Sequence, residues 1–484
     1  MNVLAEAIRE NTNKAFTKNG ALSNDSTLNG VLDFFSKSGA LRGQDNEAVK
    51  YFTRALAEDE TLAMKALFYA RDIRGGQGER SIFRNIISYM ATFHKDAIKR
   101  NLGLIPEFGR WDDIFVLFGT DLEKDALDLI KSQFDTDLES DSPSVLAKWM
   151  KSSNTSSAES RKLAKKTYTY FNMTEREYRK KVSALRKKIG IVEQKMSAKN
   201  FKDIDYSHVP SQASRIYAKS FLKRDEERYS NFIEKVENGE VKINSGTLYP
   251  YQIVSGIEFK KDKEIKTLNV LWDALPDYAE EPENSLCVVD VSGSMTMGNS
   301  NITPIDVSVS LGIYFAERMK GAFNGYFMTF SSDPKMQKIQ GKNIAEKVLN
   351  LKRSDWGFDT NIVAVFDTLL KTAIEKHVSQ DDMPKKIYII SDMQFNEAVL
   401  GGKSVKNFDA IKSTYALAGY EMPSLVFWNV NASSDTPVTR DEAGTYLVSG
   451  CSPSILKYAV NCEAATPYEL MLEVLESERY SQVK

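Results

Sequence analysis

The residues with the clearest chemical potential form a short oxygen-rich segment from Asp290 to Ser294, with the order Asp-Val-Ser-Gly-Ser. One carboxylate and two hydroxyls at alternating positions can lie on the same side of a tight loop, and Gly293 lets that loop turn. The segment directly follows an apolar run, Leu286–Val289, which predicts a buried strand. Oxygen ligands of this kind suit a hard divalent cation, so the segment is a candidate metal site.

Two further segments can add oxygen ligands to this site. The run Ile387–Ile390 predicts a strand that ends in Ser391-Asp392, and the loop of residues 356–361 offers Thr360 ahead of a helix. A compact site with only two carboxylates fits Mg²⁺, or Mn²⁺, better than Ca²⁺, and it leaves a coordination position for a carboxylate or phosphate oxygen from a partner. A capped strand end without metal is the alternative. The predicted ligands are Asp290, Ser292, Ser294, Thr360 and Asp392.

The elements that must position these residues follow an α/β pattern from about Glu281 onwards. Short β-branched runs alternate with amphipathic helices, which predicts a doubly wound parallel sheet with ligands at the carboxyl ends of its strands. The expected strands are Leu286–Val289, Gly325–Phe330, Lys386–Ile390, Leu425–Asn429 and Thr445–Val448. The expected helices are Asp306–Met319, Asn343–Leu351, Asn361–Glu375, Phe408–Ala418 and Pro467–Ser477.

The first part of the chain, from Met1 to about Ile204, has helical periodicity instead. Helices of similar length joined by short turns predict helix pairs stacked as HEAT-like repeats, which could close into a ring. With 484 residues the chain is long enough for two or three domains, and we place the boundary between residues 1–280 and 281–484. The expected helices are Gly30–Lys37, Ala48–Leu56, Thr61–Ala70, Ser81–Ile98 and Ile114–Phe134.

The most uneven charge lies in residues 161–202, with fourteen Lys or Arg and three Glu. Interleaved Tyr168, Tyr170, Phe171 and Tyr178 could give flat surfaces on which nucleic-acid bases stack. The alternative is a solvated helix face. Four arginines near helix ends in Gly-rich surroundings could bind phosphates, although neighbouring acids could pair with them. The candidate RNA-binding residues are Arg71, Arg74, Arg80, Arg110, Lys165, Lys166, Arg179, Lys180, Lys181, Arg186, Lys187 and Lys188.

The five oxygen ligands resemble, in order and in strand position, the metal-ion-dependent adhesion site of von Willebrand factor type A domains. A wider resemblance is to TROVE-type (Ro-like) proteins, which join a helical-repeat module to such a domain; it is carried by Asn19–Ser23, Arg71–Arg80 and Pro106–Asp113. Further segments are similar to a divergent branch found in plants and phages, namely Val209–Ser211, Val236–Asn244 and Tyr249–Tyr251.

This resemblance implies that the chain binds noncoding or misfolded RNA by single-stranded 3′ ends, while a protein partner supplies an acidic residue to the metal site. The alternative is a metal-dependent assembly scaffold, phage-related in origin, that binds no RNA. We expect no catalysis, because a phosphotransferase with Asp290 as nucleophile needs an acid at the position where this chain has Ser292. Three cysteines, no run of about 18 apolar residues and no apolar leader predict a soluble, cytoplasmic protein without membrane contact.

Overall fold

The computed structural model describes residues 12–279, 284–297, 302–354, 360–400, 403–431, 435–459 and 466–484. An α-helical part comes first and a doubly wound α/β part follows, so the predicted fold class is confirmed. The expectations for Met1–Asn11 and for the start of the loop before Thr360 fall outside the described residues. Within the described residues, no helix has the length and apolar character needed to cross a membrane.

The α/β part contains a six-stranded sheet in the order β10-β9-β6-β3-β4-β5. All neighbours are parallel except β4 and β5, which pair antiparallel at the edge. The strands are β3 (Ser285–Val289), β4 (Tyr326–Thr329), β5 (Met336–Lys338), β6 (Lys386–Ser391), β9 (Ser424–Asn429) and β10 (Thr445–Ser449). The strand order changes direction between β3 and β6, and ligand sites of such sheets lie at this switch point.

Helices cover both faces of this sheet. Alternate residues of each strand enter different cores: Val289 and Ile390 pack with α17 (Pro304–Arg318), and Val288 and Ile389 with α19 (Ile362–Lys376) and α20 (Asn407–Ala418). The first of these cores is continuous with the core of the helical part. The helices are α17 (Pro304–Arg318), α18 (Ile344–Lys352), α19 (Ile362–Lys376), α20 (Asn407–Ala418), α21 (Leu456–Ala459) and α22 (Pro467–Leu475). Short 3₁₀ turns are η6 (Gly293–Thr296), η7 (Gln380–Asp382), η8 (Pro453–Ile455) and η9 (Glu478–Tyr480), and a small hairpin joins β7 (Ala398–Leu400) to β8 (Lys403–Val405).

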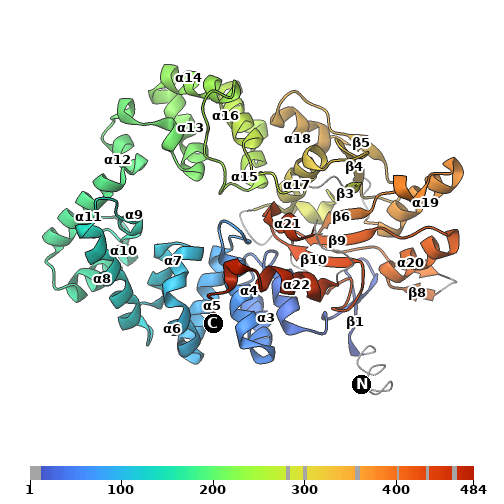
Figure 1. The fold of residues 1–484 in the computed structure, drawn as a ribbon, viewed down its shortest axis with the longest axis horizontal. Coiled ribbons are helices and arrows are strands. Elements are labelled where there is room, and N and C mark those ends of the chain that lie inside the picture. The colour runs from blue at the N-terminus through green and yellow to red at the C-terminus, as the bar shows by residue number, and fades with distance from the viewer. Residues whose placement is uncertain are drawn as a thin grey trace.

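The helical part runs in an arc from the lower edge of Figure 1, round one side and over the top, to the α/β part. Its helices are α2 (Gly30–Lys37), α3 (Asp45–Glu58), α4 (Glu60–Arg71), α5 (Arg80–Phe93), α6 (Lys95–Asn101), α7 (Ile105–Phe108), α8 (Glu123–Glu139), α9 (Leu146–Trp149), α10 (Ala158–Tyr170), α11 (Glu175–Ile189), α12 (Val192–Ser197), α13 (Ser211–Arg224), α14 (Glu226–Glu237), α15 (Pro250–Val254) and α16 (Asp262–Asp273). The 3₁₀ turns are η1 (Leu102–Leu104), η2 (Trp111–Leu117), η3 (Phe201–Asp203), η4 (Tyr206–His208) and η5 (Ile257–Phe259).

Two expected helices are each interrupted in the structure. The expected helix Ser81–Ile98 breaks at His94, where the backbone leaves the helical region with φ −140°. The expected helix Ile114–Phe134 is divided into η2 and α8 around Gly119, which has φ +91°. The helical periodicity expected from Met1 onwards is also wrong at Lys14 and Ala15, because β1 (Lys14–Phe16) pairs antiparallel with β2 (Leu22–Asn24).

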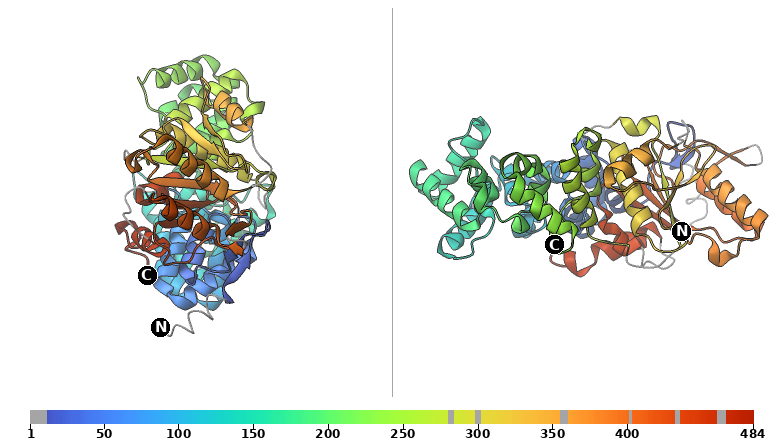
Figure 2. Two further views of the ribbon diagram at one scale, coloured as in Figure 1. Left: turned by 90° about the vertical axis from the view of Figure 1, so that its right-hand side faces the viewer. Right: turned by 90° about the horizontal axis from the view of Figure 1, so that it is seen from above.

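Both ends of the helical arc contact the α/β part, so the elements form a closed loop. At the start of the arc, α2 packs on β10 and both α2 and α4 pack on α22; at its end, α15 packs on α17 and α16 on α18. The two ends also meet directly, since a Cβ at Gly78 would collide with the hydroxyl of Tyr249. Figure 2 shows the helical and α/β parts side by side along the long axis of the molecule.

Each terminal segment packs on the part of the protein formed by the other end of the chain. Residues Lys14–Asn24, which precede the helical arc, lie on the α/β part, where Asn24 and Thr436 form a bridge. The C-terminal residues lie on the helical part: the ring of Tyr480 stacks on Phe108 at 5.5 Å between centroids, and the Lys484 amide donates to Asn101. The arc is therefore held from both ends of the chain.

Candidate functional site

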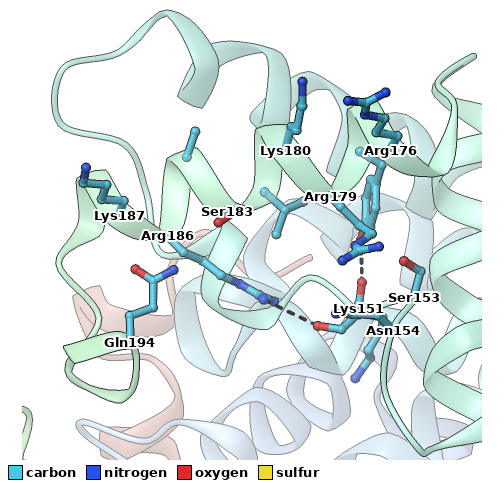
Figure 3. Close-up of a pocket in the computed structure, with 14 residues that line it drawn as sticks. Lys151, Ser153, Asn154, Arg176, Arg179, Lys180, Ser183, Arg186, Lys187 and Gln194 are labelled. Atoms are coloured by element: carbon cyan, nitrogen blue, oxygen red, sulfur yellow. Dashed lines mark hydrogen bonds between the residues drawn. The ribbon is translucent and has the colours of Figure 1, made fainter. Parts of the chain in front are cut away.

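A basic groove of about 900 Å³ runs along α11 (Figure 3). Six of its lining residues are Lys or Arg and none is acidic. One wall is the exposed face of α11 and the other is the loop after α9, from Lys151 to Asn154. The residues that line it are Lys151, Ser152, Ser153, Asn154, Arg176, Tyr178, Arg179, Lys180, Val182, Ser183, Ala184, Arg186, Lys187 and Gln194.

The sequence of α11 explains why its cations share one face. A capping box between Thr174 and Glu177 starts the helix, and Gly190 in the left-handed region ends it at φ +70°. Tyr178, Val182 and Leu185 are buried and fix the rotation of the helix about its axis. Four cations at helical spacing are left exposed over the groove, namely Arg176, Arg179, Lys180 and Lys187.

Arg186, predicted to contact RNA, lines the groove, and its guanidinium also holds the groove wall together. Its Nε donates to the carbonyl of Ala147 and its Nη2 to that of Met150, both at 2.8 Å, and Nη1 approaches Ser152 Oγ at 3.4 Å. Burial lowers the pKa of Arg186. The hydroxyl of Tyr178 donates to the Lys151 carbonyl at 2.7 Å and secures the same loop.

Two cations of the groove were missed by the sequence prediction. Arg176 lies three and four residues before Arg179 and Lys180, so helical spacing could have identified it. Lys151 comes from a loop outside the basic segment, and nothing in its local sequence indicates a role. Burial lowers the pKa of Lys151, and its ammonium lies 4.8 Å from the centroid of the Phe115 ring.

The aromatic residues of the basic segment do not form the predicted stacking surfaces. Tyr178 and Phe171 are buried, at 1% and 5% exposure, and Tyr168 packs against Tyr178 with 5.9 Å between ring centroids. Tyr170 is half-buried, and its hydroxyl is bonded to Asp128. The periodicity that puts cations outside puts these rings inside, so the groove presents charges and hydroxyls rather than exposed rings.

The four arginines predicted near the Gly-rich turns lie in different environments. Arg71 is 2% exposed and forms a buried ion pair with Asp113 at 2.7 Å, so its predicted RNA contact is wrong. Arg110 pairs with Asp112 at 3.0 Å and lies 4.2 Å from the Trp149 ring, and burial lowers its pKa. These ion pairs agree with the alternative considered for the sequence, in which neighbouring acidic residues pair with the arginines.

Arg74 and Arg80 remain on the surface. Arg74 donates to the Glu107 carbonyl at 3.0 Å, while Arg80, the first residue of α5, forms no ion pair with any residue that the structure describes. Burial lowers the pKa of Arg110, and the positive charge of Arg80 lowers it further. Arg80 therefore stays a candidate contact outside the groove.

The remaining predicted lysines surround the groove without lining it. Lys166 forms an ion pair with Glu123, and Lys188 donates to the Ser140 carbonyl at 3.0 Å. Lys165 and Lys181 are exposed on α10 and α11. Of the eight lysines and arginines predicted from the basic segment, only Arg179, Lys180, Arg186 and Lys187 line the groove.

The oxygen-rich segments meet at the carboxyl edge of the sheet. β3 and β6 pair with Val289 opposite Ile390, so the next residues, Asp290 and Ser391, leave the sheet side by side. Asp290 is fully buried; its Oδ1 accepts from the Ser292 amide at 2.8 Å and its Oδ2 from Ser391 Oγ at 2.6 Å. The hydroxyls of Ser292 and Ser294 lie 3.0 Å apart.

Asp392 and Thr360 are joined to this edge through Gln394. The Gln394 amide donates to Asp392 Oδ1 at 3.2 Å, and Thr360 Oγ1 donates to the Gln394 carbonyl at 2.6 Å. Ser294 forms a side-chain hydrogen bond with Asp392. The structure thus brings together Asp290, Ser292, Ser294 and Asp392, and it joins Thr360 to Asp392 through Gln394.

The electrostatics of this edge favour a cation. Burial first, and the neighbouring Asp392 second, raise the pKa of Asp290 to about 6. Burial also raises the pKa of Asp392, which the charge of Lys18 opposes. Neither carboxylate forms an ion pair with a Lys or Arg of the described ranges. Two carboxylates and three hydroxyls are hard donors that fit Mg²⁺ or Mn²⁺.

Comparison with known proteins places the helical part in a family. The model of a domain of unknown function, DUF2828, matches residues 17–136 and 142–277, which is more than half of the chain. The chain belongs to the DUF2828 family. A second domain of unknown function, DUF7788, matches residues 284–482 of this DUF2828 protein and so covers the α/β part with the oxygen-rich edge.

A relative of this DUF2828 protein is the uncharacterized protein L728 of Acanthamoeba polyphaga mimivirus. It is 28% identical over 512 residues, covering 96% of this chain and 87% of the relative. Among solved structures, the Ro (RSR) protein of Deinococcus radiodurans aligns over 88% of this chain and 93% of its own, with 13% identity and a TM-score of 0.41.

Proposed function

We propose that this DUF2828 protein binds noncoding or structured RNA through the basic groove of its helical part. The observation that carries the proposal is the set of exposed cations on one face of α11, namely Arg176, Arg179, Lys180 and Lys187, in a groove lined by no acid. The chain as a whole has a net charge of −2, so this concentration of positive charge is local. A local basic track of this kind is the electrostatic footprint of a nucleic-acid site.

The chemistry of the groove favours contacts with the phosphate backbone. Arginine and lysine side chains neutralise phosphates, and such contacts make affinity depend on salt rather than on sequence. Ser153 Oγ, buried behind the wall of the groove, has no hydrogen-bond partner within the described residues. Exposed rings for base stacking are not among the lining residues, so folded RNA suits the groove better than a splayed single strand.

The experiment is filter binding of the purified protein to a structured RNA with a single-stranded 3′ tail and to the same RNA with a blunt end, at two salt concentrations. Salt-dependent binding of both RNAs supports a backbone site in the groove. Preference for the tailed RNA would add capture of 3′ ends, as the TROVE resemblance implies. Absence of binding to either RNA would remove the RNA function and leave the assembly scaffold as the account of this protein.

A second function is favoured by the buried carboxylates Asp290 and Asp392, which lie together without an ion-pair partner in the described part of the chain. We propose that these residues hold Mg²⁺ or Mn²⁺ with Ser292, Ser294 and Thr360, in the manner of a von Willebrand factor type A domain. The cation would neutralise the two carboxylates and accept an acidic side chain from a protein partner as a further ligand.

The test is to measure Mn²⁺ bound to the wild-type protein and to Asp290→Ala. The proposal expects stoichiometric Mn²⁺ in the wild type and its loss in the variant, with cooperative unfolding retained in both. Equal metal content in the two proteins would contradict the assignment. Pull-down of partners with and without EDTA then shows whether association depends on the cation.

A further inference from the structure

The N-terminal arm, defined as residues Lys14–Asn24, forms part of the edge that carries the oxygen-rich site. It precedes α2 in the chain, yet its backbone bridges reach the α/β part at Asn396, Lys406 and Thr436. The hydroxyl of Thr17 donates to the Phe395 carbonyl at 2.7 Å. The turn of the arm therefore lies against the loop that follows β6.

Asn19, in this turn, contacts one of the proposed metal ligands directly. Its Nδ2 donates to Thr360 Oγ1 at 3.0 Å and to the Gln394 carbonyl at 2.6 Å. Both protons of the amide group are thus used on the loops that carry the site. Thr360 is 2% exposed, so its hydroxyl depends on these neighbours for its hydrogen bonds.

The bonds around Thr360 fix the direction of its hydroxyl. The hydroxyl has one proton and two lone pairs. The proton is directed to the Gln394 carbonyl at 2.6 Å, with Asn396 Oδ1 as a longer second acceptor at 3.3 Å, and Asn19 occupies one lone pair, which leaves the second lone pair for a cation. Without Asn19, the Thr360 hydroxyl can still donate its proton to the Gln394 carbonyl. It loses the Asn19 amide, whose hydrogen bond fixes the orientation of its lone pairs.

Gln394 extends the link from the arm to the carboxylate. Its side-chain oxygen accepts from the Lys18 amide at 2.7 Å, and its own amide donates to Asp392 Oδ1 at 3.2 Å. Lys18 and Asn19 therefore hold the same residue that connects Thr360 to Asp392. Docking of the arm and the geometry of two of the proposed ligands are coupled through this one residue.

We propose that Asn19 is a positioning residue of the metal site, through which the N-terminal arm orients Thr360 toward a bound divalent cation. The inference rests on the metal site proposed above. Partners that orient the direct ligands of a metal typically contribute 10- to 100-fold to its affinity, so Asn19→Ala should weaken Mn²⁺ binding by about 10-fold. By reciprocity, Mn²⁺ should stabilise the docked arm.

The experiment is a Mn²⁺ titration, followed by electron paramagnetic resonance, of the wild type, Asn19→Ala, Thr360→Ala and the double variant. If Asn19 acts through Thr360, the double variant binds Mn²⁺ as Thr360→Ala does, since the two losses are not additive. The control is Asn238→Ala, an exposed asparagine at the end of α14, which should bind Mn²⁺ as the wild type does.

Four results would contradict this role, and they are distinguishable. A wild type that binds no Mn²⁺ overturns the metal site and the role of Asn19 together. A wild type that binds Mn²⁺ with Asn19→Ala unchanged overturns only the positioning role, as does an equal further loss in the Thr360→Ala background. Trypsin cleavage after Lys18 gives a second readout: Mn²⁺ should slow it in the wild type and not in Asn19→Ala, and equal slowing in both would also overturn the role.

Discussion

The guanidinium of Arg186 lies 2.8 Å from the carbonyl oxygen of Met150, so this cation holds the wall of the groove in place. Its neighbour Lys187 lines the same groove and is exposed. Two adjacent cations of one basic run therefore have separate roles. The difference follows from the helix, which turns successive side chains toward different surroundings.

Replacing Arg186 should reduce stability, whereas replacing Lys187 should not. Arg186→Ala leaves the carbonyls of Ala147 and Met150 without their donor, which costs about 1 to 3 kcal/mol. Lysine at this position cannot reproduce the planar set of bonds, so Arg186→Lys should recover little. Urea unfolding measures the free energies, with Lys187→Ala as the matched control. Equal stability of Arg186→Ala and Lys187→Ala would contradict this role.

The C-terminal tail should stabilise the helical part through Asp72. This carboxylate is fully buried and accepts from Arg479 Nη2 at 2.7 Å and from the Tyr480 hydroxyl at 3.0 Å. Arg479→Ala should destabilise the protein by about 3 kcal/mol, since it removes the partner of a buried charge. Thermal and urea unfolding test this, with Gln482→Ala, an exposed change in the same tail, as control. A variant with the stability of this control would show that the tail contact is dispensable.

In EDTA, the stability of the protein should fall as pH rises. The folded state raises the pKa of Asp290 from 3.8 to about 6, so it binds a proton more tightly than the unfolded chain does. The resulting stabilisation is complete below pH 3.8 and is lost as the pH passes through 6, to an extent of about 3 kcal/mol. Urea unfolding of the wild type at pH 5 and pH 7.5 measures the part of this loss that falls above pH 5, about 1.4 kcal/mol.

Asp290→Asn is the matched variant for this effect, because it keeps the shape of the side chain without the titration. Its stability in EDTA should exceed that of the wild type at pH 7.5, and its pH dependence should be smaller. Mn²⁺ should stabilise the wild type at pH 7.5 and leave the variant unchanged. A variant with the same pH dependence as the wild type would show that Asp290 is not the group responsible.

Much of the fold follows from the sequence because its patterns are local. The β-branched runs that became β3, β6, β9 and β10 are predicted to within a residue or two at each end, and α2 is predicted at its observed bounds. β5 and the hairpin of β1 and β2 are missed. They are short, and they are stabilised by distant pairing, as when Asn24 bridges Thr436, which no local pattern records.

The two candidate sites differ in how far sequence alone could define them. The oxygen ligands follow strands, and the switch point of the sheet brings them together by rule. The basic segment gives a charge count but not the direction of each side chain. Tertiary packing decides that Arg71 and Tyr178 are buried. It also decides that Lys151, from another loop, lines the groove. Asn19 reaches Thr360 across more than three hundred residues of chain, for which the sequence holds no signal.

The most direct measurement for this account is the affinity for structured RNA of a variant with Arg176, Arg179, Lys180 and Lys187 all changed to Glu. Its control carries the same change of charge at Lys162, Lys165, Lys181 and Lys199, exposed lysines of the basic segment that do not line the groove. We predict that the groove variant no longer binds RNA tightly, and that its salt slope falls by about 0.7 to 0.9 for each phosphate that the groove no longer neutralises, while the control retains most of its affinity. Equal affinity of the two variants would contradict RNA binding in the groove.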